Sequence, residues 1–152
     1  MVKPHILVVD DDVYIVETLT SFLEIQGCRV TAAYGCKQAM DRLRTQDKVD
    51  LIILDYFMPD GSGTDLLRTL GEEKSIQRPP VIMSSGIIDN NTPVWEKLRK
   101  QLPPASQALI QAYVNKPYRL DAMDIAVHEV LGGDYIPGPR LNRKIEKLIR
   151  PQ

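Results

Sequence analysis

The sequence has few cysteines and no leader pattern. Cys28 and Cys36 are the two cysteines among 152 residues, and they lack the spacing of a metal site. The start of the chain, Met1-Val2-Lys3-Pro4-His5, leads straight into a short apolar run without the cleavage pattern of a signal peptide. We therefore expect two free thiols in a reducing compartment, and a cytoplasmic protein.

The sequence also lacks a large net charge and long apolar runs. The formal net charge is −1, so nothing draws the whole chain toward nucleic acid or an anionic membrane. No apolar run approaches the length that a bilayer requires, and we expect no membrane insertion. Internal repeats and low-complexity tracts are absent, which excludes solenoids. With 43% hydrophobic and 26% charged residues, the sequence predicts a globular domain with a core.

What the sequence does contain is an alternation of strand-like and helix-like segments. Apolar runs of strand length lie at 6–9, 29–33, 51–54, 81–83 and 112–114. Helical spacing of apolar residues follows at 15–23, 35–46, 63–73 and 120–131. Glycines are expected to end the first and last of these helices, at Gly27 and Gly132-Gly133. Five strand-like segments alternating with helix-like ones predict an α/β fold, a doubly wound parallel sheet with helices on both faces.

The segment 87–111 is long for a single crossover between the last two strands. Thr92-Pro93 is typical of a helix start, with Thr as the N-cap and Pro in the first turn. Pro103-Pro104 should break a helix. We therefore expect two short helices there and an extended crossover.

After the last expected helix the composition changes. We expect a domain over residues 1–133 and a basic tail over 134–152. In this tail, Pro137-Gly138-Pro139 predicts a turn, and an apolar stripe after it predicts a short helix. The tail is too short for a complete output domain such as a winged helix. Two readings stay open: a solvated helix docked on or near the domain, or a contact for a partner, a nucleic acid or a second copy.

Polar residues lie within two residues of the ends of four of the expected strands. Asp10 and Asp11 end the first, Asp55 ends the third, and Ser85 and Lys116 come after the fourth and fifth. Each alone could be a cap, a turn residue or a solvated side chain. Together, at the carboxyl ends of parallel strands, they predict one crevice. Carboxylate oxygens suit Mg²⁺, and a hydroxyl with an ammonium beside the metal would bind a phosphoryl group.

At these positions the sequence resembles a known family. The segments Ile6–Asp12, Leu54–Gly63, Pro80–Gly86 and Lys116–Tyr118 look like the receiver domain (CheY-like) of two-component response regulators, in the right order. The resemblance covers residues 5 to about 132. It implies a flavodoxin-like, five-stranded parallel sheet of strand order 2-1-3-4-5.

The resemblance also implies roles for site residues. Asp55 would be the phosphoacceptor, and Ser85 and Lys116 would contact the phosphoryl group. Mg²⁺ would be held by the carboxylates of Asp10, Asp11 and Asp55 and by the backbone carbonyl of Phe57. Tyr113, three residues before the lysine, matches the switch aromatic of the family, so the switch pair would be Ser85 and Tyr113.

The implied function is a phosphoacceptor signalling switch and not a turnover enzyme. Its implied partners are a sensor histidine kinase or a histidine phosphotransfer protein, an unknown downstream protein, and in some readings a second copy in a homodimer. Direct DNA binding is not expected of this chain alone. An alternative is the receiver portion of a longer DNA-binding or enzymatic regulator. A pseudo-receiver is disfavoured by the full residue set, and a haloacid-dehalogenase-like phosphatase by Phe57, where a second Asp would be needed.

Overall fold

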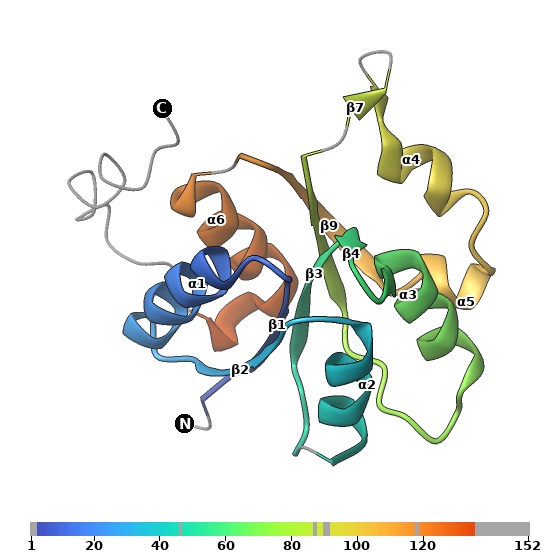
Figure 1. The fold of residues 1–152 in the computed structure, drawn as a ribbon. Coiled ribbons are helices and arrows are strands. Elements are labelled where there is room, and N and C mark those ends of the chain that lie inside the picture. Colours follow the sequence, from blue (N-terminus) through green and yellow to red (C-terminus); the bar gives the residue numbers. More distant parts are fainter. Residues whose placement is uncertain (1–2, 46, 87, 90–91, 118, 136–152) are drawn as a thin grey trace.

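The computed structural model describes residues 3–45, 47–86, 88–89, 92–117 and 119–135. Its main sheet has five parallel strands in the order β2-β1-β3-β6-β9 (Figure 1). These strands are β1 (His5–Val9), β2 (Arg29–Ala33), β3 (Leu51–Asp55), β6 (Val81–Ser85) and β9 (Ile110–Asn115). Numbered within this sheet, the order is 2-1-3-4-5, so the predicted flavodoxin-like fold is confirmed.

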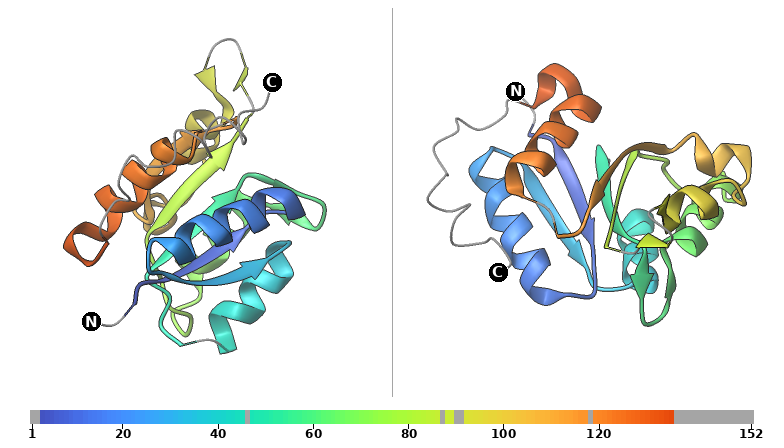
Figure 2. Two further views of the ribbon diagram at one scale, coloured as in Figure 1. Left: turned by 90° about the vertical axis from the view of Figure 1, so that its left-hand side faces the viewer. Right: turned by 90° about the horizontal axis from the view of Figure 1, so that it is seen from above.

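Helices cover both faces of the sheet, as predicted. The long ones are α1 (Val13–Ile25), α2 (Cys36–Thr45), α3 (Gly63–Glu72) and α6 (Leu120–Leu131). In Figures 1 and 2, α1 and α6 lie on one face, and α2 and α3 lie on the other. Within the described ranges, no helix combines the length and the apolar character needed to span a membrane.

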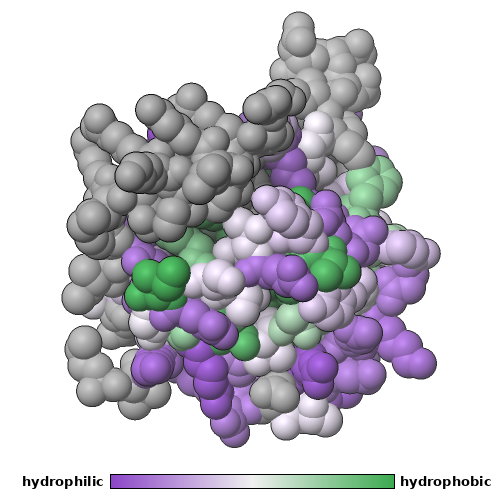
Figure 3. Space-filling model, turned by 60° about the vertical axis from the view of Figure 1, so that its left-hand side comes forward, coloured by the Kyte–Doolittle hydropathy of each residue, from purple (hydrophilic) through white to green (hydrophobic). Residues whose placement is uncertain are grey.

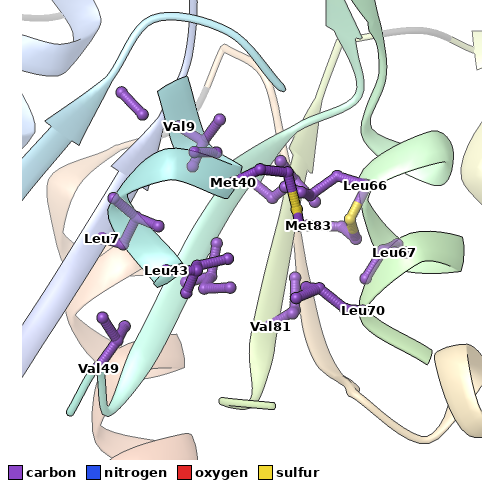
Figure 4. Close-up of a cluster of buried hydrophobic side chains, with 14 of the residues drawn as sticks. Leu7, Val9, Met40, Leu43, Val49, Leu66, Leu67, Leu70, Val81 and Met83 are labelled. Carbon is purple, nitrogen blue, oxygen red and sulfur yellow. The ribbon is translucent and has the colours of Figure 1, made fainter. Parts of the chain in front are cut away.

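The core lies in two layers, one on each side of the sheet. All five residues of β1, of β3 and of β6 are buried, which explains their unbroken apolar runs. Successive strand residues alternate between the layers: Leu7 and Val9 pack toward α2 and α3 (Figure 4), whereas Ile6 and Val8 pack toward α1 and α6. The strand ends are thereby fixed by packing on both faces.

The long crossover contains the two short helices predicted for it, with one correction. They are α4 (Val94–Arg99) and α5 (Pro104–Gln107), and Pro103 is the N-cap of α5. The expected helix start at Thr92 is wrong: β8 (Thr92–Pro93) pairs with β7 (Ile88–Asp89) in a small hairpin, and the helix begins at Val94. A strand in a two-stranded hairpin has a free edge, where proline's missing N–H is tolerated.

The crossover is anchored to the main body by α5 and by Leu102, two residues before it. Leu102 is 4% exposed and belongs to the core layer beneath α3. Gly71 in α3 allows α5 to approach closely, because a Cβ at this glycine would lie 2.2 Å from Ser106 Oγ. The inserted chain therefore packs against α3 and extends the layer of α2 and α3.

The packed chain continues past the last helix. Gly132 takes φ +66° at the end of α6, and a short 3₁₀ turn (Gly132–Asp134) follows. Tyr135 then returns to the core beside α1 and α6, with 2% exposure, and its hydroxyl donates to the buried carboxylate of Asp124. The side of the molecule that carries α1 is otherwise mostly polar with separate apolar patches (Figure 3). The remainder of the predicted tail, 136–152, lies outside the described residues.

Candidate functional site

The carboxylates predicted to converge do so at the carboxyl ends of β1 and β3. Val9 pairs with Leu54, so the residues that follow each of them, Asp10 and Asp55, leave neighbouring strands side by side. One carboxylate oxygen from each of Asp10, Asp11 and Asp55 lies within 4.8 Å of the others. Asp10 and Asp55 are buried, at 4% and 8% exposure, and Asp11 is exposed. The result is an acidic crevice with buried walls and an open side.

The three consecutive aspartates after β1 have different local roles. Asp12 is the N-cap of α1, where its Oδ1 accepts from the backbone N–H of Tyr14 at 3.0 Å and of Ile15 at 3.3 Å. The N–H of Asp12 donates in turn to Asp10 Oδ1 at 2.9 Å. This turn holds one oxygen of Asp10 in place.

Lys116 brings a cation into the crevice. It follows β9, and its backbone N–H donates to the carbonyl of Ser85 at 3.0 Å. Its Nζ lies 2.5 Å from Asp10 Oδ2 and 3.3 Å from Asp55 Oδ1. Burial alone would lower the pKa of Lys116, but the hydrogen bond and charge of Asp10, together with Asp55, outweigh burial and raise it. The lysine is therefore a fixed ammonium between two buried carboxylates.

Asp55 is the carboxylate whose ionisation is most opposed by its surroundings. Burial raises its pKa to about 6, the nearby charge of Asp10 adds to the increase, and Lys116 opposes it. A nearby cation would stabilise the ionised form of such a buried carboxylate. The crevice can hold a cation, because carboxylate oxygens of three residues lie close together there and Asp11 is exposed to solvent.

Ser85 and Tyr113 lie together beside the crevice. The Tyr113 hydroxyl donates to the backbone carbonyl of Ser85 at 3.0 Å, and burial raises the tyrosine's pKa. Asp55 is in register with Ser84, so Ser85, one residue further, projects toward the opposite face of the sheet. Ser85 and Tyr113 share that face, because Met83 and Tyr113 are register partners.

The loop after Asp55 forms a small hairpin that the sequence analysis missed. Its strands are β4 (Phe57–Met58) and β5 (Gly61–Ser62), paired antiparallel. Phe57, the residue expected to offer a backbone carbonyl to the metal, is 51% exposed. The ring of Tyr56 packs edge-on against it, with 4.5 Å between centroids.

Asp60, at the tip of this hairpin, is a second residue that the sequence analysis missed. Its carboxylate accepts hydrogen bonds from the first backbone N–H groups of α2, at Cys36 and Lys37. The signal in the sequence is weak: α2 begins after Gly35, which has no side chain to cap it, and a Pro-Asp-Gly turn lies elsewhere in the chain.

The donor set fits a hard divalent cation. Mg²⁺ is held in proteins by oxygen ligands, commonly one or two carboxylates with water or phosphate completing the shell. The oxygens of Asp10, Asp11 and Asp55 are close enough to share one ion, and two of these residues are buried, so their mutual repulsion is not screened by water. The residues present therefore fit Mg²⁺.

Comparison with known proteins gives a consistent result. Residues 6–128 match the family described as the response regulator receiver domain. The two-component response regulator ORR12 of Oryza sativa subsp. japonica is 32% identical over 120 residues, which are 79% of this chain and 92% of that protein. A crystal structure of a response regulator receiver protein from Pseudomonas putida is 28% identical, with a TM-score of 0.69, over 85% of this chain and 98% of that one.

A CheY-like receiver domain from Methanospirillum hungatei shares the fold, with a TM-score of 0.70 at 23% identity over 88% of this chain and 97% of that one. The family match spans most of the chain, from β1 into α6, and includes the acidic crevice and Lys116. The chain therefore belongs to the response regulator receiver domain family of two-component systems.

Proposed function

We propose that this protein is a phosphoacceptor signalling switch in which Asp55 receives the phosphoryl group. Response regulators are phosphorylated by histidine kinases or histidine phosphotransfer proteins, and receiver domains bind Mg²⁺ in an acidic pocket. The observation that carries the proposal is the position of Asp55: its carboxylate lies 3.3 Å from the Lys116 ammonium and within 4.8 Å of the Asp10 and Asp11 oxygens. A nucleophile, a cation and candidate metal ligands thus meet at one strand end.

The chemistry is a transfer between two nucleophiles. An ionised Asp55 oxygen attacks the phosphorus of a phosphohistidine, forming the O–P bond of an acyl phosphate while the P–N bond breaks. The bonding electron pair leaves with the imidazole nitrogen of the donor, which then takes up a proton from solvent. Lys116 can turn from the Asp10 carboxylate toward the incoming phosphoryl oxygens, since it already lies within reach of both sides.

A metal ion in the crevice would offset the negative charges of the carboxylates and of the phosphoryl group. Asp10, Asp11, Asp55 and the Phe57 carbonyl would hold Mg²⁺, which when bound supplies positive charge to the phosphoryl oxygens. Asp11, which is exposed, keeps one side of the crevice accessible to the donor. The buried Asp10 is held by Lys116 and by the N–H of Asp12, so its oxygens are oriented before any ligand arrives.

Phosphorylation of Asp55 would be read out through Ser85 and Tyr113. The Ser85 hydroxyl would move toward the phosphoryl oxygens, and this shift would displace the carbonyl that holds the Tyr113 hydroxyl. A small change at the crevice would then alter the surface around β9. On this account the protein acts by binding a downstream partner and does not turn over a substrate.

A small phosphodonor tests the proposal without a partner kinase. Wild-type protein incubated with acetyl phosphate and Mg²⁺ should gain the mass of one phosphoryl group, and chelation of the metal by EDTA should prevent the gain. Absence of any modification with Mg²⁺ present, in protein whose fold is verified by circular dichroism, would refute the phosphoacceptor function.

A further inference from the structure

The tip of the hairpin that follows Asp55 is hydrogen-bonded to the start of α2. Asp60 lies in the two-residue turn between β4 and β5. Its Oδ1 accepts from the Cys36 N–H at 2.9 Å, and its Oδ2 accepts from the Lys37 N–H at 3.1 Å. The first N–H groups of a helix have no acceptor within the helix, and the Asp60 carboxylate supplies one for α2. It therefore caps this helix from a position 23 residues away from Lys37 in the sequence.

The neighbouring loop is built to receive this carboxylate. Gly35 precedes α2, and its carbonyl accepts the N–H of Ala39 at 3.0 Å, which makes it the capping position of the helix. A side chain there would collide with the carboxylate, because a Cβ on Gly35 would lie 2.7 Å from Asp60 Oδ1. Hydrogen bonds from Lys37 and Cys36 lower the pKa of Asp60, so the cap is charged at neutral pH. The negative charge also faces the positive end of the helix dipole.

The rest of the hairpin is held at its base. The N–H of Gly63 donates to the Tyr56 carbonyl at 2.7 Å, and a Cβ on Gly63 would lie 2.7 Å from the Asp55 carbonyl. Ser62 and Asp65 form a reciprocal capping box that ties the second arm to the start of α3. The base is therefore fixed by the phosphoacceptor strand and by α3, and the tip is fixed by Asp60 to α2.

The metal ligand expected on this hairpin lies between these two anchors. Phe57 pairs with Ser62, and Met58 pairs with Gly61. A two-stranded hairpin with two such pairs is marginally stable by itself in water, so its tether decides how well its carbonyls are positioned. Residues that orient metal ligands without touching the metal commonly affect metal affinity by about 10- to 100-fold.

We propose that Asp60 is a positioning residue for the metal-dependent phosphoryl transfer: by bridging the β4–β5 hairpin to α2, it holds the Phe57 carbonyl beside the acidic crevice. The inference rests on the proposed function, in that it takes the Phe57 carbonyl as a metal ligand. It assigns Asp60 two separable effects, a cap that stabilises α2 and a tether that sets the geometry of the metal site.

Two variants separate the cap from the tether. Asp60→Ala removes both. Asp60→Ala combined with Gly35→Ser returns a capping hydroxyl to the start of α2 without reconnecting the hairpin, and the space for this side chain is created when the Asp60 carboxylate is removed. Asp47→Ala is the matched control, since this aspartate has a side chain 81% exposed and pairs with Arg29 away from the crevice.

Three quantities are measured on each protein: the melting temperature, the Mg²⁺ dissociation constant without phosphodonor, and the hydrogen exchange of the amides of residues 57–62 in metal-free protein. Asp60→Ala should lower the melting temperature, weaken Mg²⁺ binding roughly tenfold and speed exchange in the hairpin. The double variant should regain the melting temperature but keep weak Mg²⁺ binding and fast exchange. The control should match the wild type.

Two results would overturn the inference. Mg²⁺ affinity that is unchanged in Asp60→Ala would show that the hairpin holds its geometry without the tether. Recovery of Mg²⁺ affinity together with the melting temperature in the double variant would show that Asp60 is a helix cap and nothing more. Neither result touches the proposed function, which fails if the wild type takes up no phosphoryl group or if Asp55→Asn is phosphorylated as fully as the wild type.

Discussion

The Lys116 ammonium lies closer to Asp10 than to Asp55, at 2.5 Å from Asp10 Oδ2 and 3.3 Å from Asp55 Oδ1. The lysine therefore neutralises a predicted metal ligand at the same time as it approaches the phosphoacceptor. The ammonium of Lys116 compensates the charge of two buried carboxylates, so its removal should lower the stability of the fold.

Lys116→Met should destabilise the metal-free protein at about pH 7 by roughly 3 kcal/mol, because removing one partner of a buried ion pair leaves the other charge uncompensated. Denaturant unfolding measures this loss. Lys48→Met is the matched control: its ion pair with Asp50 spans 3.6 Å and its side chain is 85% exposed, so the change should be under about 1 kcal/mol. Equal losses in the two variants would contradict a buried pair at Lys116.

Asp55 should make stability fall as pH rises in the absence of metal. Its pKa in the folded protein is about 6, above the ordinary value of 3.8, so the folded state binds the proton more tightly than the unfolded state. The resulting stabilisation is fully present below about pH 4 and is lost as pH rises through about 6. The loss amounts to about 3 kcal/mol from a shift of about two units. Asp55→Asn should lack it.

Denaturant unfolding of wild type and Asp55→Asn across this pH range, in EDTA, measures the difference directly. The variant should be the more stable protein at about pH 7, and its advantage should shrink toward about pH 4. An advantage that stays constant with pH would show that the Asp55 carboxyl does not titrate abnormally.

Asp11→Ala should abolish both Mg²⁺ binding and phosphorylation by acetyl phosphate. The crevice offers few oxygen ligands, and Asp11 is the exposed one that keeps the open side anionic. Metal titration followed by tyrosine fluorescence, with Asp12→Ala as a neighbouring variant that removes the side-chain cap of α1, distinguishes loss of a ligand from loss of local structure. Unchanged affinity in Asp11→Ala would place the metal elsewhere.

The phosphorylated form should be long-lived for this family. Loss of phosphate needs a water in line with the bond to Asp55. The family resemblance implies that the side chains two residues after the phosphoacceptor and two after the site hydroxyl flank this approach. Here these positions are Phe57, which is 51% exposed, and Ile87, which lies outside the described residues. Neither can hydrogen-bond a water. Removal of the donor followed by measurement of phosphate loss should show faster decay in Phe57→Asn with Ile87→Glu, and equal decay would remove this explanation.

Strand ends were the part of the site that the sequence could predict. Asp10, Asp55 and Lys116 each follow an apolar run, and the carboxyl ends of parallel strands meet at one edge of a sheet. Such predictions need only the period of the apolar residues and the topology of the fold. The role of Asp12 needed the structure, because the three consecutive aspartates do not themselves show which carboxylate caps α1.

The features that were missed depend on contacts that leave no periodic pattern. The hairpin of β4 and β5 has two residues in each strand, too few for an alternation to be recognised. Asp60 caps a helix far away in the sequence, and its partner Gly35 is a residue type with many other uses. Tyr135 lies next to glycines and prolines typical of a linker, yet it is buried against Asp124.

The most direct test of the account is the mass of the Asp55→Asn variant after treatment with acetyl phosphate and Mg²⁺. The wild type should gain the mass of one phosphoryl group, and the variant, with Asp10, Asp11 and Lys116 intact, should gain none, because an amide is not a competent nucleophile for this transfer. Full phosphorylation of Asp55→Asn would contradict the account, since it would show that another residue accepts the phosphoryl group.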